Sequence, residues 1–287
     1  MIQQIGVVGA GQMGRGIAQV AAANGAHVLL ADQTLALATA GCEAIKTGLA
    51  RLVEKNKMSE LDASRIVDCI KPCGDWAQFD DRALVIEAAI EHEASKCALF
   101  TKLDRIVPDE CILASNTSSI SITRLGQATG RPDRVIGMHF MNPVPRMALV
   151  EVIRGVCTSD ITYERVCATA RAMGKTVVTS QDYPGFIVNR ILMPMINEAA
   201  FALMEGVASA EDIDAAMKLG TNQPMGPLEL ADFIGLDTCL AIMEVMHRDL
   251  GDSKYRPCPL LRRLVDAGRL GKKSALGGFH VSVKTVH

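Results

Sequence analysis

The chain has 287 residues, enough for two domains of ordinary size and a sizeable hydrophobic core. Hydrophobic residues make up 49% of it and aromatic residues 4%, a composition typical of a helix-rich α/β protein rather than of a disordered or all-β one. The 30 basic and 32 acidic residues nearly balance, so no nucleic-acid or membrane-surface partner is expected.

From residue 4 to about residue 181, short β-branched runs alternate with amphipathic helical patterns. This alternation predicts a doubly wound, mostly parallel β-sheet. The predicted strands cover residues 5–8, 28–31, 84–88, 112–114, 135–138, 149–153 and 176–179. The predicted helices between them cover residues 13–23, 36–55, 63–69, 96–106 and 163–173.

The pattern changes where Pro184 and Gly185 interrupt it, and helical periodicity with little strand signal follows. The sequence therefore predicts an α/β domain over residues 1–183 and an all-helical domain over residues 184–287. The predicted helices of the second domain cover residues 186–206, 209–219, 228–234, 238–250 and 260–266.

Neither export nor membrane insertion is expected. A buried strand is predicted already at residues 4–9, which leaves no room for a signal peptide. The most apolar stretch, residues 17–31, is interrupted by polar residues, whereas a membrane span needs about 20 mostly apolar ones. Nine cysteines without a Cys-x-x-Cys pair or metal-ligand spacing predict reduced thiols and no metal site. The expected location is the cytoplasm, or a matrix-like compartment.

A glycine-rich segment, Gly9-Ala10-Gly11-Gln12-Met13-Gly14, directly follows the first predicted strand and opens a helix. In this pattern the first glycine permits a tight turn, the second lets a pyrophosphate approach the backbone, and the third lets helix and strand pack closely. The free N–H groups of the helix start then face the phosphates. This context predicts a Rossmann-type dinucleotide-binding domain.

Asp32 ends the second predicted strand, eighteen residues after Gly14. A carboxylate there accepts hydrogen bonds from the adenine-ribose hydroxyls and repels a 2′-phosphate, so the sequence favours NAD over NADP. A turn aspartate without a ligand role is the alternative interpretation.

His139 and Glu151 are candidates for acid–base chemistry. Oxidising an alcohol needs a base for the hydroxyl proton, and histidine suits this because its ordinary pKa lies near neutrality. His139 follows one predicted strand and Glu151 lies on the next, where it could hydrogen-bond the far ring nitrogen and stabilise the imidazolium. Taken alone, a histidine such as His139 is more often a structural residue than a catalytic one.

Six segments resemble the L-3-hydroxyacyl-CoA dehydrogenase family, in particular its short 3-hydroxybutyryl-CoA form. They cover residues 115–119, 139–145, 149–152, 184–190, 225–227 and 235–237, and they occur in the family's order over nearly the whole chain. The resemblance implies NAD-dependent oxidation of a short (S)-3-hydroxyacyl-CoA to the 3-oxoacyl-CoA, and the reverse. It also implies that His139 is the general base, that Glu151 orients it, and that Ser118 and Asn189 hold the substrate oxygen.

The resemblance further implies that Glu91, Lys96, Asn142 and Lys273 contact the nicotinamide end of NAD. On the sequence alone, Glu91 and Lys96 look like the solvated start of a helix. The segment around Lys273 departs from the family, because it carries one extra residue and ends in His280 instead of tyrosine.

Lys55 matches a family lysine that contacts coenzyme A, although a solvated basic face formed with Arg51 is an alternative explanation. The family serine seven residues before Lys55 is Gly48 here, which puts one hydrogen bond to coenzyme A in doubt. Arg146 and Ala148 also depart from the family pattern.

A homodimer through the C-terminal domain is expected, both from the resemblance and because the predicted helix 186–206 is apolar on all sides. Three alternative functions are compatible with this type of fold. A dehydrogenase with a catalytic lysine is disfavoured because residues 185–190 contain none. The same chemistry on an acyl-carrier-protein thioester, and a non-catalytic structural protein on this fold, remain alternatives.

Overall fold

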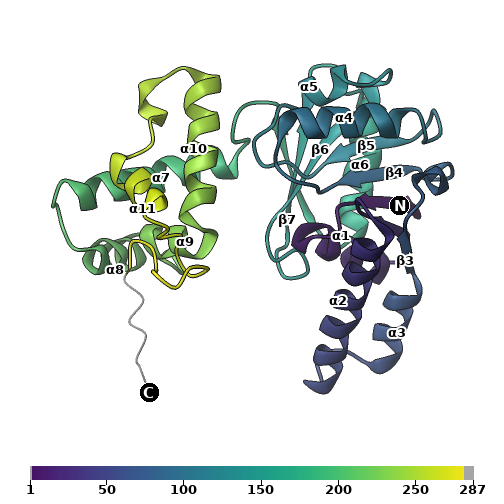
Figure 1. The fold of residues 1–287 in the computed structure, drawn as a ribbon, viewed down its shortest axis with the longest axis horizontal. Helices are drawn as coiled ribbons and strands as arrows, with labels where there is room; N and C mark the ends of the chain where they lie inside the picture. Colours follow the sequence, from purple (N-terminus) through teal and green to yellow (C-terminus); the bar gives the residue numbers. More distant parts are fainter. Residues whose placement is uncertain (1, 281–287) are drawn as a thin grey trace. The chain divides into compact units, whose positions relative to one another are not determined.

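The computed structural model describes residues 2–280, and the chain divides into two compact units between Tyr183 and Pro184. The first unit is a mostly parallel sheet flanked by helices, and the second consists of helices (Figure 1). These features confirm the predicted fold class, a Rossmann-type α/β domain followed by an all-helical one.

The sheet of the first unit has the strand order β3-β2-β1-β4-β5-β6-β7-β8. Neighbouring strands run parallel except β6 and β7, which are antiparallel. The chain winds outward in both directions from β1 and β4, and ligands of such sheets bind at this switch point. The strands are β1 Gln4–Val8, β2 His27–Ala31, β3 Ile70–Cys73, β4 Leu84–Glu87, β5 Ile112–Ser115, β6 Val135–Phe140, β7 Leu149–Arg154 and β8 Thr176–Gln181.

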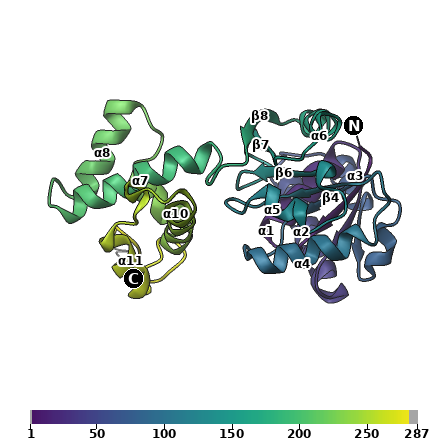
Figure 2. The same cartoon turned by 90° about the horizontal axis from the view of Figure 1, so that it is seen from above.

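Helices cover both faces of the sheet (Figure 2). A side-chain oxygen of serine or threonine caps the start of α2, α3, α5 and α6 and satisfies a free N–H there. The helices are α1 Gln12–Ala23, α2 Leu35–Glu54, α3 Glu60–Asp68, α4 Glu93–Asp104, α5 Ile122–Gln127 and α6 Asp160–Ala172. Short 3₁₀ turns cover Trp76–Phe79 and Pro132–Arg134.

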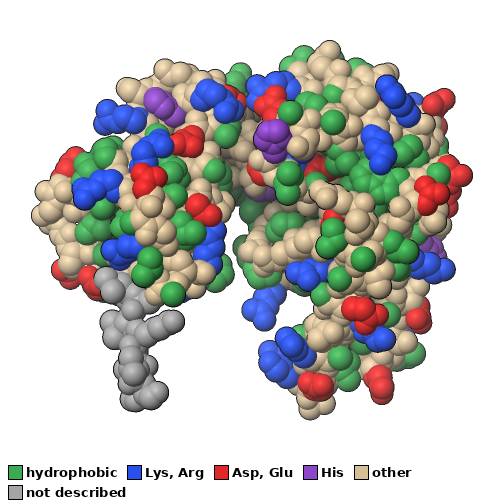
Figure 3. All heavy atoms as spheres, viewed as in Figure 1, with side chains coloured by type: hydrophobic (Ala, Val, Ile, Leu, Met, Phe, Trp, Pro, Cys, Tyr) green, Lys and Arg blue, Asp and Glu red, His purple; other side chains and the backbone are tan. Residues whose placement is uncertain are grey.

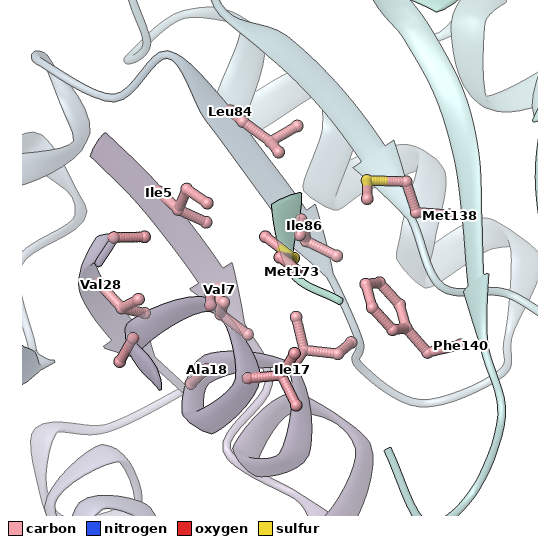
Figure 4. Packing of buried hydrophobic residues seen from close by; sticks show 14 of the residues in the cluster. Ile5, Val7, Ile17, Ala18, Val28, Leu84, Ile86, Met138, Phe140 and Met173 are labelled. Atoms are coloured by element: carbon pink, nitrogen blue, oxygen red, sulfur yellow. The ribbon is translucent and has the colours of Figure 1, made fainter. Parts of the chain in front are cut away.

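The main core of this unit lies on one face of the sheet and includes buried residues of α1, α2, α3 and α6. Figure 4 shows the part of this core beside α1. Ile5 and Val7 of β1 and Ile86 of β4 pack there against Ile17 of α1. Alternate residues of each strand must point to opposite faces of the sheet. Glu87, Ser115, His139 and Glu151 accordingly belong to the face opposite this core, on the side of α4 and α5.

The second unit packs five helices around its own core. Met193 and Ile196 of α7, Leu228 of α9 and Met243 of α10 are among its buried side chains. Apart from an isolated bridge between Gly271 and Gly277, residues 184–280 contain no β-structure. The helices are α7 Val188–Met204, α8 Ala210–Thr221, α9 Pro227–Ile234, α10 Leu236–Leu250 and α11 Pro259–Asp266, with a 3₁₀ turn over Ser253–Tyr255. Within residues 2–280 no helix is long and apolar enough to cross a lipid bilayer.

The sequence missed β3 and α5 and placed the start of α7 too early. Strand β3 is a short edge strand whose two central residues, Lys71 and Pro72, are exposed, so it lacks an alternating apolar pattern. Helix α7 begins at Val188 instead of residue 186, because Gly185 and Phe186 adopt positive φ angles of 83° and 50°, which an α-helix cannot contain.

Candidate active site

His139 of β6 and Glu151 of β7 are direct partners in the antiparallel register, so their side chains stand on the same face of the sheet. His139 Nδ1 lies 2.7 Å from Glu151 Oε2. The histidine is 6% exposed and the glutamate 0%. A carboxylate withdrawn from water to this degree needs a hydrogen-bonded partner, and the imidazole supplies one.

Ser118 lies on the other side of the same imidazole, with its Oγ 3.2 Å from His139 Nε2. Because Glu151 accepts a hydrogen bond from Nδ1–H, Nε2 carries the lone pair of the neutral ring and can accept the serine hydroxyl. Asn116 ties this loop to β6, since its Oδ1 accepts the backbone N–H of Phe140 at 2.9 Å. The arrangement provides a base whose basic nitrogen is already directed at a hydroxyl group.

Glu91 accepts hydrogen bonds from the loop that carries Ser118. Its Oε1 accepts the backbone N–H of Ser118 at 2.9 Å and the hydroxyl of Thr117 at 2.5 Å. The side chain of Glu91 is 41% exposed, whereas that of Lys96 is 2% exposed. The reading of Lys96 as part of a solvated helix start is therefore wrong, because its ammonium group is buried beside Glu87 at 2.5 Å.

The glycine-rich loop has the geometry that a dinucleotide needs. Gly9 has a φ of 106°, and a Cβ there would lie 2.5 Å from the carbonyl oxygen of Ala88. A Cβ on Gly14 would lie 1.7 Å from the carbonyl oxygen of Gly9, so close helix–strand packing requires glycine there. At Gly11 a Cβ would meet nothing within 4 Å, which leaves the backbone open toward a ligand.

A pocket of about 500 Å³ opens beside this loop. Its lining includes Gly9, Gly11, Gln12, Met13, Asp32, Trp76, Ala89 and Lys96. A glycine-rich helix start, a carboxylate at the end of β2 and a buried cation fit the phosphates, ribose and polar ring of NAD. Bound NAD would serve as the hydride acceptor or donor.

Asp32 is fixed from two sides. Its Oδ2 accepts the backbone N–H of Ala10 and its Oδ1 that of Gln33, both at 2.7 Å. The indole of Trp76, which the sequence analysis overlooked, donates to the backbone carbonyl of Asp32 at 3.3 Å. Gln12 of α1 donates to Oδ1 of Asn142 at 3.0 Å, which links the glycine-rich segment to the loop after β6.

The loop after β6 is anchored by a buried lysine that the sequence did not single out. Lys175 Nζ donates to the carbonyl oxygens of Val144 at 2.6 Å and Met147 at 2.8 Å. Burial lowers the pKa of Lys175 from its ordinary value, because the charged form loses its hydration. The lysine thus supplies hydrogen-bond donors to two carbonyl groups of this loop.

Two further expected substrate contacts differ in burial. Lys55 is the exposed residue that ends α2, and a Cβ at Gly48 on the same helix would meet nothing within 4 Å. Figure 3 shows Lys and Arg side chains among acidic ones over α2 and α3. In the second unit, Asn189 lies in the first turn of α7 and is 7% exposed.

The C-terminal segment of the second unit holds the remaining expected contact. Lys273 Nζ lies 2.6 Å from Asp237 Oδ1. His280, which stands in place of the family tyrosine, places Nε2 2.7 Å from Asp214 Oδ2. Among residues 2–280 no group of three or more His, Cys, Asp or Glu side chains is arranged to hold a metal ion.

Comparison with known proteins finds the same two-part organisation. Residues 4–183 match the NAD-binding domain of 3-hydroxyacyl-CoA dehydrogenase, and residues 185–280 match the C-terminal domain of the same enzyme. The chain is 56% identical over 284 residues to a probable 3-hydroxybutyryl-CoA dehydrogenase of Bacillus subtilis, with 99% of each chain covered. It is 53% identical to the 3-hydroxybutyryl-CoA dehydrogenase of Bradyrhizobium diazoefficiens, over 97% of this chain and 95% of the relative.

Among solved structures, the fold is similar to that of the (S)-3-hydroxybutyryl-CoA dehydrogenase of Ralstonia eutropha. The TM-score is 0.95 at 49% identity, and the alignment covers 98% of this chain and 99% of that one. Both domains of this family therefore match, and the relatives are aligned over nearly their full length. The chain belongs to the NAD-dependent 3-hydroxyacyl-CoA dehydrogenase family.

Proposed function

We propose that this protein oxidises short (S)-3-hydroxyacyl-CoA thioesters, 3-hydroxybutyryl-CoA above all, to 3-oxoacyl-CoA with NAD, and also catalyses the reverse reduction. The observation that carries the proposal is the imidazole of His139, held between Glu151 at 2.7 Å and Ser118 at 3.2 Å on the dinucleotide-binding unit. The names of the relatives from Bacillus and Ralstonia support the choice of substrate.

In the oxidation, Nε2 of His139 accepts the proton of the substrate C3 hydroxyl group as the hydride leaves C3. The imidazolium that forms is stabilised by Glu151, whose carboxylate already accepts a hydrogen bond from Nδ1–H. In the reduction, the same imidazolium returns the proton to the C3 oxygen. Because Glu151 is fully buried, its charge is poorly screened and acts strongly on the ring.

Ser118 and Asn189 bind the substrate oxygen in this mechanism. The hydroxyl group of Ser118, next to Nε2, and the carboxamide of Asn189 donate hydrogen bonds to the oxygen as its carbonyl character develops. Lys55 binds the phosphate-bearing end of coenzyme A from α2. Glu91, Lys96, Asn142 and Lys273 contact the nicotinamide half of NAD.

The first test is a steady-state assay that follows the loss of NADH absorbance with acetoacetyl-CoA. We expect turnover with NADH, and a kcat/KM at least about tenfold lower with NADPH, because the Asp32 carboxylate repels a 2′-phosphate. Equal kcat/KM values would contradict the cofactor preference. Faster turnover of acetoacetyl-acyl carrier protein would favour the carrier-protein alternative, and no turnover of either thioester would favour a structural protein.

We also propose a homodimer formed through the second unit. Several of its large apolar side chains are exposed: Ile191 is 68% exposed, Val207 72%, Leu219 87% and Phe233 52%. Exposed apolar side chains favour burial against a partner, and a second copy is the commonest partner in soluble enzymes. Sedimentation at micromolar concentration should therefore give about twice the mass of the chain, and a monomer would rule the dimer out.

A cytoplasmic location is part of the proposal, and the cysteines support it. All nine are free thiols, as a reducing compartment maintains them. Burial raises the pKa of Cys42 to about 11 and that of Cys111 and Cys239 to about 12. These three thiols therefore stay protonated and unreactive near neutral pH.

A further inference from the structure

Glu87 is a buried carboxylate that neither the sequence motifs nor the proposed mechanism uses. It is the last residue of β4, the strand next to β1 at the switch point of the sheet, and it is 0% exposed. An ionised group in such a place is retained only where specific donors replace its lost water. The donors around Glu87 therefore indicate what it does.

Three donors surround the carboxylate. Oε1 accepts from Lys96 Nζ at 2.5 Å and from the backbone N–H of Ala89 at 2.6 Å. Oε2 accepts from the hydroxyl group of Ser115, its register partner on β5, at 2.6 Å. Both carboxylate oxygens therefore accept hydrogen bonds, and Lys96 is the one charged group among these three donors.

Lys96 connects this carboxylate to the cofactor pocket. It comes from the first turns of α4, is 2% exposed, and lines the pocket beside the glycine-rich loop together with Ala89. Its Nζ also lies 3.4 Å from Glu91 Oε2 and 3.3 Å from the carbonyl oxygen of Ala89. A lysine has four flexible side-chain bonds, and these fixed acceptors hold its ammonium group at the pocket wall.

Glu91 links Lys96 to the loop that carries Ser118. While Oε2 faces Lys96, Oε1 accepts the backbone N–H of Ser118. The hydroxyl group of the same serine lies 3.2 Å from His139 Nε2. A series of hydrogen bonds, joined between Lys96 and Glu91 by an ion pair, thus runs from Glu87 to the imidazole.

We propose that Glu87 is a positioning residue, which holds the ammonium group of Lys96 at the cofactor pocket and, through Glu91, sets the position of the Ser118 loop beside His139. Glu87 touches neither substrate nor cofactor in this role. Filling of the cofactor pocket and orientation of the catalytic serine are therefore coupled through one buried ion pair.

The test is direct binding of NADH to the full-length protein without any thioester. Trp76 is the single tryptophan of the chain and lines the cofactor pocket, so energy transfer from its emission to NADH reports occupancy. Glu87→Gln keeps the size of the side chain and removes its charge. We expect its Kd for NADH to rise about tenfold or more.

Glu93→Gln is the matched control. It makes the same chemical change at the start of α4, the helix that carries Lys96, where Glu93 pairs with Arg124 at 2.8 Å and its side chain is 39% exposed. We expect its Kd for NADH to stay within about twofold of the original, since exposed pairs contribute little. The amide resonance of Ser118 should move in Glu87→Gln and stay in place in Glu93→Gln.

A double-mutant cycle separates positioning from general stability. If Glu87 acts through Lys96, Glu87→Gln should change the Kd by less than about twofold when Lys96→Met is already present. A lower melting temperature with an unchanged Kd and an unmoved Ser118 resonance would show a purely structural role and overturn the proposal. If Glu87→Gln does not fold, Glu87→Asp keeps the charge but withdraws it from Lys96, and an unchanged Kd there would equally overturn it.

This inference uses the NAD-binding role of the first unit and is independent of the thioester. A failed acetoacetyl-CoA assay would refute the proposed substrate and leave the NADH measurements interpretable. Conversely, an unaltered Kd in Glu87→Gln would refute the positioning role while acetoacetyl-CoA turnover stands.

Discussion

His139→Gln is expected to lower kcat on the order of 10³-fold, because it removes the base that takes the substrate proton. Glu151→Gln should lower kcat on the order of 10²–10³-fold, which corresponds to a lost charge contact of about 3–4 kcal/mol in the transition state. The amide can still accept a hydrogen bond from Nδ1–H but supplies no negative charge to the imidazolium. Steady-state rates with acetoacetyl-CoA and NADH measure both effects.

The two residues should behave as one unit. The double variant is expected to be little slower than His139→Gln alone, since a missing base leaves Glu151 nothing to stabilise. NADH binding, followed through Trp76, should be unchanged in all three variants because neither side chain lines the cofactor pocket. A His139→Gln protein with kcat within about threefold of the original, about 0.65 kcal/mol in barrier, would refute the mechanism.

Two alanine substitutions in the glycine-rich loop are expected to affect different properties, stability in one case and NADH affinity in the other. Gly14→Ala places a methyl group 1.7 Å from the carbonyl oxygen of Gly9, so α1 must move away from β1. We expect it to lower the free energy of unfolding by about 2–4 kcal/mol, as overpacking against rigid backbone does. Thermal or urea unfolding measures this loss.

Gly11→Ala is the opposite case. Its methyl group meets no protein atom within 4 Å, and the backbone there has a φ of −71°, which alanine adopts readily. Stability should change by less than about 1 kcal/mol. NADH affinity should nevertheless fall about tenfold or more, because the methyl group occupies the space by which the pyrophosphate approaches. Normal NADH binding by Gly11→Ala would show that the phosphates lie elsewhere.

Local pattern was enough to predict the elements that carry the chemistry. Glycines between a strand and a helix, and a carboxylate ending the next strand, are short-range signals, and the structure places the Asp32 carboxylate against the backbone of the glycine-rich segment. The pairing of His139 with Glu151 could be anticipated because both belong to neighbouring strands in the chain. Strand β3 was not predicted, because an edge strand needs little apolar surface and because Pro72 is unusual in a strand.

The buried polar contacts could not be predicted from local pattern. Glu87 ends an apolar strand and Lys96 lies in the first turns of a helix, and neither residue taken alone indicates a buried ion pair. Their pairing depends on how α4 returns over the sheet, which is a property of the tertiary fold. The same is true of Lys175, whose acceptors lie about thirty residues earlier in the chain. A charged residue at the carboxyl end of a buried strand is the one sequence signal that could have drawn attention to Glu87.

The antiparallel pairing of β6 with β7 has a consequence for how such a site tolerates change. Because His139 and Glu151 face each other in one hairpin, a shift of a single residue in the pairing would send one side chain to the opposite face of the sheet. Insertions or deletions inside either strand should therefore abolish catalysis. Substitution of Arg146 or Ala148 in the connecting residues 141–148 should leave the two side chains opposed, because the loop is held through Asn142, Val144 and Met147. The hairpin thus holds the base and its carboxylate as one structural unit, which should tolerate side-chain changes at Arg146 and Ala148 far better than any change in the length of either strand.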